Sequence, residues 1–379
     1  MRAMIIGGGV AGPVAALALR RVGCDVTVYE ACTDPAGNVG SYVSLSANGL
    51  RALEVIGARA GVAASGTEIP LLRLWSGRGK LLGEAQRGRV TLMRGHLVET
   101  LRNLAAEAGV EIVTGRRLRD LADGVATFTS TGRATDSQDA DLEATADVII
   151  GADGIHSRLR TVIDPDAPAP SYAGLWTIGG RSTHAVEPGA FNLMFGARAT
   201  FIHAATSSGT LWTAQVPAGT RPTVPLDRAA LLALYAGDRG PAAAIIEQTD
   251  QWHPCTVMQS LPSMPRIRRD NMILIGDAAH PIGAGQGASL AIEDAVILAK
   301  CIRDRDSVAA ALDSFELVRR PRTDKMLKAA GANHDAKVAG PFAARVRDVM
   351  MPVFFRRFAE KGGAWMYDYD VEWQTPVAI

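Results

Sequence analysis

The residues that most clearly suggest chemistry are three glycines near the start of the chain, Gly7, Gly9 and Gly12, and an acidic residue, Glu30. Around them, residues 2–29 show the pattern of a strand, an apolar helix and a second strand. In that setting Gly7 permits a tight turn, Gly9 lets a pyrophosphate approach the backbone, and Gly12 lets the helix pack closely on the sheet. Glu30 follows the second strand, where a carboxylate accepts hydrogen bonds from a ribose diol. The spacing predicts a dinucleotide-binding unit with phosphates at the helix N-terminus.

Two further glycine–aspartate turns follow predicted buried strands far along the chain. Asp147-Val148-Ile149-Ile150 runs into Gly151-Ala152-Asp153-Gly154, and Met272-Ile273-Leu274-Ile275 runs into Gly276-Asp277. We expect Asp277 to accept a hydrogen bond from a ribose or ribityl hydroxyl, although an aspartate there can also cap a short turn.

A glycine-rich loop comes next, with Gly283, Gly285 and Gly287 directly before a predicted helix. Its backbone N–H groups and the positive end of that helix can stabilise negative charge on a bound group. His280 lies just before this loop, and we expect it to order the loop by hydrogen bonding rather than to react.

Together these motifs, over residues 7–12, 151–160 and 276–281, resemble those of the single-component (group A) FAD-dependent aromatic monooxygenases, typified by p-hydroxybenzoate hydroxylase. The resemblance covers roughly residues 1–330. It implies a Rossmann-like α/β FAD-binding domain, an inserted β-sheet substrate domain and a helical C-terminus. It further implies FAD as cofactor and NADH or NADPH as co-substrate. The implied reaction is O₂-dependent hydroxylation through a flavin C4a-hydroperoxide.

The resemblance also implies roles for individual residues. Arg94 matches an arginine that contacts the cofactor and the aspartate of the second motif, Asp153. Leu118 matches a position whose backbone meets the adenine. Arg158 and Arg160 either receive the phosphates of NAD(P)H or only pair with Asp153.

In the third motif, the resemblance places Gly276 and Asp277 against the cofactor. Pro281 and Gly283 would lie where the flavin reacts with oxygen, and Gly285 and Gly287 beside the flavin ring. No side-chain nucleophile is required, because the flavin carries the bond-making chemistry.

Candidate substrate-lining residues come from the strand-rich segment of residues 172–216 and from an earlier hairpin. His203 either orients or deprotonates a phenol, or is a hydrogen-bonded wall residue, which is the more common case. The segment carries few charges, which favours an aromatic or polycyclic substrate over a small carboxylic acid. The full set is Trp75, Trp176, Phe195, Phe201, His203 and Trp212.

Composition excludes several other classes of protein. Of 379 residues, 47% are hydrophobic and 21% charged, and the net charge is +1, so no nucleic-acid partner is expected. The four cysteines lack metal-ligand spacing, so no metal site is expected. No apolar run is long enough to span a bilayer, and we expect a cytoplasmic protein with reduced cysteines.

The order of the patterns predicts one sheet interrupted by an inserted domain. We assign residues 1–70, 94–170 and 265–330 to the FAD-binding domain. Residues 71–93 and 171–264 form the substrate domain, and 331–379 a C-terminal helical segment. We further expect a loop over residues 34–46, a helix from about Ser307 to Ala330 that breaks near Pro321, and terminal aromatics that act as packing anchors.

Related chemistries remain alternatives to hydroxylation: a flavoprotein reductase of isoprenoid double bonds, a halogenase, or a non-catalytic flavoprotein that shields a labile intermediate. A halogenase should carry a WxWxIP motif, which the sequence lacks. The sequence does not choose a substrate or an oligomeric state.

Overall fold

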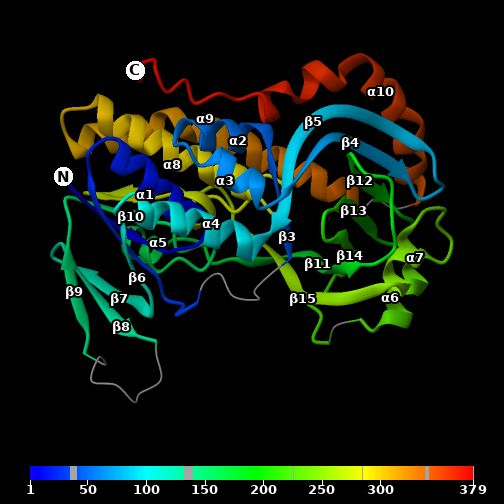
Figure 1. The fold of residues 1–379 in the computed structure, drawn as a ribbon, viewed down its shortest axis with the longest axis horizontal. Helices are drawn as coiled ribbons and strands as arrows, with labels where there is room; N and C mark the ends of the chain where they lie inside the picture. The colour runs from blue at the N-terminus through cyan, green and yellow to red at the C-terminus, as the bar shows by residue number, and fades with distance from the viewer. Residues whose placement is uncertain (35–40, 132–139, 225, 284, 338–340, 379) are drawn as a thin grey trace.

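A computed structural model describes residues 1–34, 41–131, 140–224, 226–283, 285–337 and 341–378. The described chain divides into two parts that lie side by side, each built on its own sheet, with long helices running along the top of both (Figure 1). This arrangement agrees with the fold that the motifs predict.

The first part is a six-stranded sheet whose strand order is β16-β17-β10-β1-β2-β6. All neighbouring pairs are parallel except β16 with β17. Strands far apart in the sequence are therefore neighbours in space, and their carboxyl ends lie at one edge. The bounds are β1 (Arg2–Ile6), β2 (Asp25–Tyr29), β6 (Glu111–Val113), β10 (Val148–Gly151), β16 (Arg268–Arg269) and β17 (Met272–Leu274).

Helices cover one face of this sheet and a smaller sheet covers the other. On the helical face, Ile5 and Val28 are fully buried against apolar side chains of the helices. On the opposite face, Met4 and Ile149 pack with Phe128 of the three-stranded sheet β7-β8-β9. The covering elements are α1 (Ala11–Arg21), α2 (Ala47–Val55), α3 (Arg59–Ala64), α4 (Arg94–Glu107), α8 (Gly287–Asp304), α9 (Val308–Lys337), and on the other face β7 (Arg116–Ala122), β8 (Val125–Ser130), β9 (Leu142–Thr145) and α5 (Arg158–Ile163).

The second part is an eight-stranded sheet of order β15-β11-β14-β13-β12-β4-β5-β3. We call the face that packs against α6 and α7 the outer face, and the opposite one the inner face. The bounds are β3 (Tyr42–Ser46), β4 (Thr67–Ser76), β5 (Leu81–Met93), β11 (Ser171–Ser182), β12 (Ala190–Phe195), β13 (Thr200–Thr206), β14 (Gly209–Pro217), β15 (Thr249–Ser260), α6 (Arg228–Tyr235) and α7 (Ala242–Glu247).

The C-terminal segment connects the two parts. Helix α10 (Pro341–Tyr367) packs along β5, and the tail then returns above the helices of the first part (Figure 1). Lys300 donates hydrogen bonds to the carbonyl oxygens of Val371 and Glu372, and Arg51 to those of Tyr367 and Tyr369. Basic side chains thus hold the tail by its backbone.

The terminal aromatics pack as predicted. Trp365 joins a small apolar cluster beneath α9, and Tyr369 and Trp373 pack against the main core. The guanidinium of Arg322 lies 3.9 Å from the Tyr369 ring centroid, and that of Arg303 lies 4.6 Å from the Trp373 centroid. These contacts confirm that the aromatic residues are packing anchors.

Two sequence expectations were wrong. Residues 42–46, expected to be part of a loop, form β3, which pairs with β5 in the eight-stranded sheet. Residues 35–40 of that expected loop lie outside the described residues. Helix α9 continues through Pro321 instead of breaking there. The carbonyl that Pro321 leaves without a helical partner belongs to Leu317, whose side chain is 58% exposed, so water can reach this turn.

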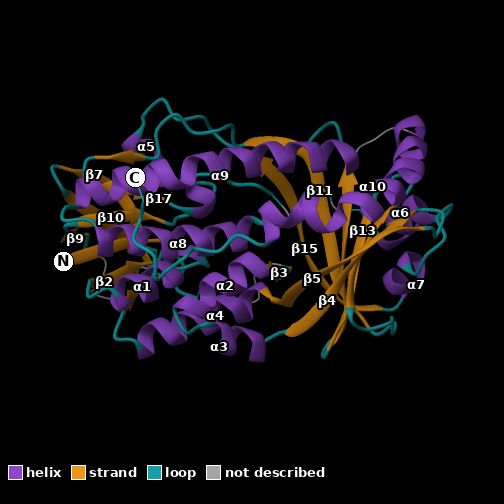
Figure 2. Cartoon of the chain, turned by 90° about the horizontal axis from the view of Figure 1, so that it is seen from above, coloured by secondary structure: helices purple, strands orange, loops and turns teal. Residues whose placement is uncertain are grey.

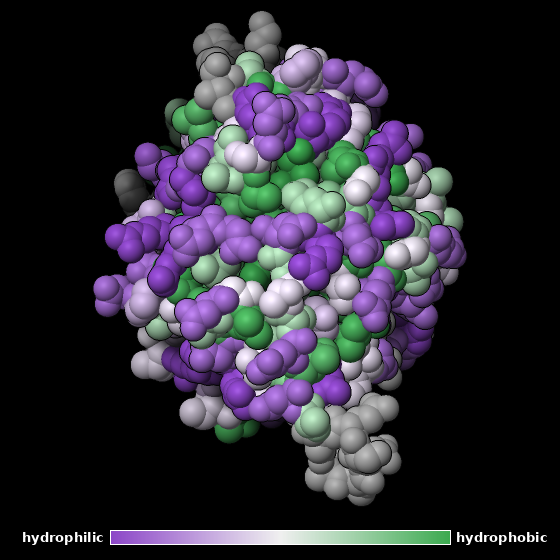
Figure 3. Space-filling model, turned by 90° about the vertical axis from the view of Figure 1, so that its left-hand side faces the viewer, coloured by the Kyte–Doolittle hydropathy of each residue, from purple (hydrophilic) through white to green (hydrophobic). Residues whose placement is uncertain are grey.

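None of the helices in the described residues is long and apolar enough to cross a lipid bilayer. Viewed from the end that carries β7–β9, polar side chains cover much of the surface with apolar ones between them (Figure 3).

Figure 2 shows the two parts from above, with β4 and β5 running from the junction into the second part. Tyr42–Ser46 belongs to the second sheet even though it precedes α2, so the chain passes between the two parts early.

Candidate functional site

The three motifs meet at one edge of the six-stranded sheet. Ile6, the last residue of β1, pairs with Gly151 of β10 on one side and with Tyr29 of β2 on the other. Gly151 in turn pairs with Leu274 of β17. The residues that follow each strand, which include the glycine turn, Glu30, Asp153 and Asp277, are therefore neighbours. We call this region the dinucleotide edge.

The glycines of the first turn are required by close backbone approach. Gly7 has φ +110°, and a Cβ there would lie 2.3 Å from the carbonyl oxygen of Ala152. A Cβ on Gly12 would lie 1.9 Å from the carbonyl oxygen of Gly7. By contrast, a Cβ on Gly9 would have no atom within 4 Å, so this glycine faces open space. The turn is thus closed towards the protein and open where a phosphate would approach.

Glu30 has a structural task that the sequence did not reveal. Its carboxylate accepts hydrogen bonds from the N–H of Gly8 at 2.5 Å and from the N–H of Cys32 at 2.7 Å. The side chain therefore fixes the glycine turn against the end of β2. Its predicted contact with a ribose stays a prediction.

Asp153 organises the start of α5. One carboxylate oxygen accepts the N–H groups of Arg158 at 2.7 Å and Leu159 at 3.2 Å. Its other oxygen, Oδ1, is buried without a hydrogen-bond partner. Burial raises the pKa of Asp153, and the hydrogen bonds oppose this shift. A buried acceptor without a partner favours the approach of a hydroxyl or amide donor at this edge.

The two arginines of the second motif differ in position. Arg160 is 3% exposed and donates to the carbonyl oxygens of Ala278 at 3.1 Å and Ile155 at 2.6 Å. It ties the second motif to the third and is closed to a nicotinamide phosphate. Arg158 is exposed, with its Nε bonded to the carbonyl oxygen of Arg119, so of the two only Arg158 can still receive a phosphate.

Asp277 faces a recess. Its side chain is exposed, yet burial raises its pKa, which means that protein surrounds an accessible carboxylate. A Cβ on Gly287, the first residue of α8, would lie 3.5 Å from its Oδ1. The charge of Arg94 lowers the pKa of Asp277, so this arginine lies near the third motif. Among the described residues, no ion pair or hydrogen bond joins Arg94 to Asp153, so the contact that the resemblance implied is not formed here.

The glycine-rich loop lies between the two sheets. Gly283 has φ +70°, and a Cβ on it would lie 2.9 Å from the terminal methyl of Met258 in β15. Gly285 has φ +125° with no atom within 4 Å of its Cβ position. Pro281 precedes the loop and is buried. The loop therefore contacts the second sheet at one point and is open at another.

A buried charge cluster supports this loop from behind. Asp294 accepts hydrogen bonds from His280 Nε2 at 2.6 Å, Gly276 N–H at 2.9 Å and Arg319 Nε at 2.8 Å. Arg319 also lies 2.9 Å from Glu293, which binds Arg322 and Asn48. The positive neighbours lower the pKa of Asp294 to about 2, and Asp294 raises that of His280. His280 thus orders the loop by hydrogen bonding, as expected from the sequence.

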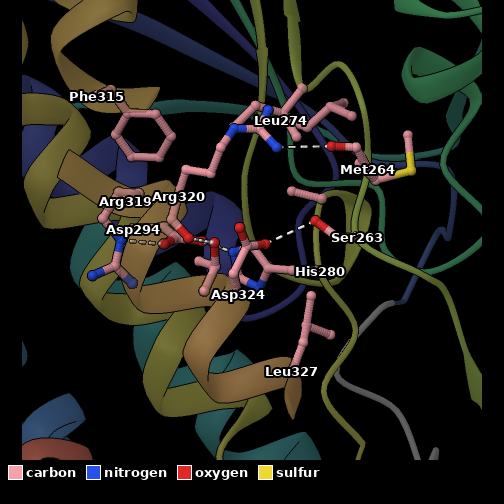
Figure 4. A pocket seen from close by; sticks show the side chains of 13 residues that line it. Ser263, Met264, Leu274, His280, Asp294, Phe315, Arg319, Arg320, Asp324 and Leu327 are labelled. Atoms are coloured by element: carbon pink, nitrogen blue, oxygen red, sulfur yellow. Dashed lines mark hydrogen bonds and ion pairs between the residues drawn. The ribbon is translucent and has the colours of Figure 1, made fainter. Parts of the chain in front are cut away.

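A cavity of about 20 Å³ lies beside this cluster. Figure 4 shows Arg319 and His280 converging on Asp294 at its wall. Ser263 and Asp324 close another side with a hydrogen bond of 2.7 Å. Its volume matches a single water molecule, so it is part of the support and not a substrate site.

The predicted substrate residues require a correction. Trp176, Phe201 and Trp212 lie in the core of the outer face, against α6 and α7, and each is at most 4% exposed. Trp75 packs against the same core and bonds through Nε1 to Asn192. The expectation that these side chains line the pocket was wrong, because a strand's alternate residues point to opposite faces and these belong to the covered one.

His203 also lies on the outer face, whereas Phe195 lies on the inner face, where α10 covers it. His203 pairs with Trp212 across β13 and β14, so it shares the outer face, and burial lowers its pKa to about 4. Its Nδ1 is buried without a partner. Phe195 packs with Leu74 and Leu82 beneath α10, and the guanidinium of Arg347 lies 4.3 Å from its ring centroid.

The inner face carries residues that the sequence reasoning missed. Phe191 and Ile202 form an apolar cluster there with partly buried Tyr42. Arg89 lies on the same face, since it pairs with Ile69 of that cluster. The available signal was the alternation of residues 89–93, which puts Arg89 opposite to the apolar Val90 and Leu92.

These residues fit an extended dinucleotide. A closed glycine turn, an orphaned Asp153 oxygen and the recessed Asp277 lie along one edge. Leu118, by contrast, buries its side chain between β7 and the first sheet, so only its backbone is available, as expected.

Comparison with known proteins agrees. A family model described as an FAD binding domain matches residues 1–330. The chain belongs to this family. Among curated relatives, the aurachin C monooxygenase/isomerase of Stigmatella aurantiaca is 28% identical, covering 92% of this chain and 93% of that protein. The FAD-dependent urate hydroxylase of Klebsiella pneumoniae is also 28% identical, covering 87% and 88%.

Solved structures share the fold of this flavoprotein. HpxO of Klebsiella pneumoniae, complexed with FAD and uric acid, superposes with a TM-score of 0.79 at 22% identity, covering 97% of this chain and 95% of that one. The tetrameric 2-methyl-3-hydroxypyridine-5-carboxylic acid oxygenase gives 0.73 at 24% identity, covering 93% and 97%. The chain is thus a flavin-dependent monooxygenase with FAD as its cofactor and NAD(P)H, typical of this family, as its co-substrate.

Proposed function

We propose that this flavoprotein hydroxylates an aromatic small molecule held between the inner face of the eight-stranded sheet and the dinucleotide edge. The convergence of the three motifs on one edge, opposite an apolar sheet face, is the observation that carries this proposal. Relatives named for urate and aurachin C support an aromatic, ring-containing substrate. We retain the domain division predicted from the sequence, with β3 and the first residues of β4, Thr67 to Pro70, added to the substrate domain.

The chain's own residues would bind, orient and exclude water. The N–H groups around Gly9 and the N-terminus of α1 would hold the pyrophosphate, and Glu30 a ribose. Asp277 would accept a hydroxyl of the ribityl chain. The loop with Gly285 and the N-terminus of α8 would stabilise negative charge at the flavin ring. Bound FAD supplies the redox and oxygen chemistry.

The third motif would set the position of the ring relative to the substrate. Arg160 joins it to the second motif, and Asp294 holds Gly276 and His280. Pro281 and Gly283 would border the reaction space, and Arg158 is available for a nicotinamide phosphate. These side chains position groups and none acts as a nucleophile.

The test is to purify the protein, release the bound yellow cofactor and identify it, and then follow NAD(P)H oxidation with a library of phenols and polycyclic aromatics. Hydroxylation predicts stimulated NAD(P)H consumption and a product that gains one oxygen atom from labelled O₂. Purified protein that neither contains nor binds FAD would contradict the proposal. Stimulated oxidation with a reduced or halogenated product would favour the alternative chemistries.

A further inference from the structure

The inner face contains a buried cation, Arg89. Arg89 is 8% exposed, and among the described residues no carboxylate forms an ion pair with it. Its Nε donates to the carbonyl oxygen of Arg87 at 3.2 Å, but its Nη2 is buried without any hydrogen-bond partner. A buried charge left unpaired is costly, so proteins rarely keep one without a use.

The surroundings of Arg89 suit a flat, apolar ligand. Its guanidinium lies 4.6 Å from the ring centroid of Phe191, which packs with Ile69 and Ile202. This contact holds the guanidinium against the ring, and its Nη2 is left without a hydrogen bond. The neighbouring Tyr42 is only half-buried, so the cluster has a side open to a ligand.

Two further polar groups lie on this face. The hydroxyl of Tyr42 lies near Thr213 of β14, and burial raises the pKa of Tyr42 to about 12, so it is a neutral donor at physiological pH. Gln215, two residues further along β14, is 1% exposed and its Oε1 has no hydrogen-bond partner. A cation, a neutral hydroxyl and an unused amide oxygen therefore share one sheet face.

The same face borders the glycine-rich loop. Arg89 pairs with Ser46 across β5 and β3, so the two side chains lie on one side of the sheet. Ser46 Oγ accepts a hydrogen bond from Gln286 at 3.1 Å, and its N–H donates to Ser289 Oγ at 3.0 Å. Arg89 is therefore one strand away from the loop expected to lie beside the flavin.

We infer that Arg89 binds an anionic oxygen of the substrate, a carboxylate or an ionised phenol or enol, while the substrate ring lies on the inner face beside Phe191. This inference rests on the proposed function and adds a substrate class to it. A guanidinium forms strong, charge-assisted hydrogen bonds with such oxygens. The tyrosine hydroxyl at Tyr42 is the second donor, and Gln215 Oε1 accepts from an N–H or O–H of the substrate.

Arg89 gives the pocket a charge that the sequence-based view of an apolar pocket did not include. That view considered only residues 172–216, whereas the charge comes from β5, which precedes them. The substrate is therefore an acidic aromatic and not a neutral polycycle.

The experiment compares matched probes with the FAD-loaded protein in the absence of NAD(P)H, at pH 8. The probes are 1-hydroxy-2-naphthoate, its methyl ester, and 1-methoxy-2-naphthoate, and binding is read from the change in the flavin absorption spectrum. We expect the free acid to bind about 10- to 100-fold more tightly than at least one masked form, as one charge-assisted hydrogen bond requires. Loss in the ester identifies the carboxylate as the bound group, and loss in the ether alone identifies the phenolic oxygen.

The variants are Arg89→Met, Arg89→Lys and a control, Arg181→Met. Arg181 is a cation of the same sheet that pairs with Asp250 in a half-exposed ion pair, so its removal should change no affinity. Arg89→Met should abolish the preference for the acid while the masked probes bind as before, and Arg89→Lys should restore part of it. FAD content and thermal unfolding show whether each variant is folded.

The inference would be overturned if Arg89→Met kept the wild-type preference for 1-hydroxy-2-naphthoate over the masked probes. It would also be overturned if the wild-type protein bound all three probes equally, or bound neither of the two naphthoic acids. If Arg89→Met does not retain FAD, the comparison of wild type with Arg89→Lys decides. Failure of the proposed function looks different: the protein then lacks FAD or forms no hydroxylated product from any aromatic, acidic or neutral.

Discussion

Replacing Arg319 with methionine should destabilise the folded protein by about 3 kcal/mol. Its guanidinium is 1% exposed and lies 2.8 Å from Asp294 and 2.9 Å from Glu293, both of which are fully buried. Removing one partner from a buried ion pair typically costs about 3–5 kcal/mol, since the remaining charge is uncompensated. We expect a loss of stability at the low end of this range, because Asp294 keeps its hydrogen bonds to His280 and Gly276.

The assay is urea-induced unfolding followed by tryptophan fluorescence, with the FAD content of each sample matched because bound cofactor adds stability. Arg181→Met serves as the control, since it removes a half-exposed ion pair worth about 0–1 kcal/mol. Arg319→Lys keeps the charge and should lose less than Arg319→Met. A loss below about 1 kcal/mol for Arg319→Met would show that the cluster does not support the fold in the way described.

Acid should act on the same cluster. The folded-state pKa of Asp294 is depressed to about 2, so its contribution is present above its unfolded pKa and is lost as pH falls from about 4 through 2. His280 has a raised pKa, so its contribution is present below its unfolded pKa and is lost as pH rises through the folded value.

The remaining predictions concern the turn, the outer face and the tail. Gly7→Ala should abolish FAD binding or folding, because its Cβ would lie 2.3 Å from a backbone oxygen; retained FAD at wild-type affinity would contradict this. His203→Leu should leave turnover within about twofold, and a hundredfold drop in kcat would restore a catalytic role. Because the folded-state pKa of His203 is depressed to about 4, the wild-type protein loses stability as pH falls from 6.5 to 4, and the variant should lose less over that range. Lys300→Met should free the tail at Val371, measured as faster amide exchange there, while unchanged exchange would refute the anchoring.

Much of the dinucleotide edge could be predicted from the sequence because its constraints are local. Gly12 is fixed by its contact with the Gly7 carbonyl inside one strand–turn–helix unit, Gly7 has a φ of +110° in that turn, and Asp277 directly follows its strand. Such short-range requirements leave a readable spacing in the chain. The neighbour relations of β1, β10 and β17 then follow from the right-handed crossovers of a parallel sheet.

The substrate face could not be predicted because both faces of its sheet are buried. Alternation separates Phe201 from Ile202, but each face is apolar, so the pattern does not tell which one α6 and α7 cover. The aromatic residues chosen as substrate-lining candidates lie mostly on the outer face, where Trp212 packs in the core instead of lining a pocket. Similarly, residues 42–46 alternate apolar Val43 and Leu45 with Ser44 and Ser46, but the Gly-, Pro- and Ser-rich composition favoured a loop. Their partner strand β5 lies far along the chain.

The structure of the protein crystallised with FAD tests the central claim most directly. We predict one extended FAD whose pyrophosphate lies against Gly9 and the N-terminus of α1, with Glu30 at a ribose and Asp277 at the ribityl chain. The flavin ring should reach the loop at Gly285, next to the inner face. Cofactor density elsewhere, or an FAD that contacts the first glycine turn without reaching Asp277, would contradict the account.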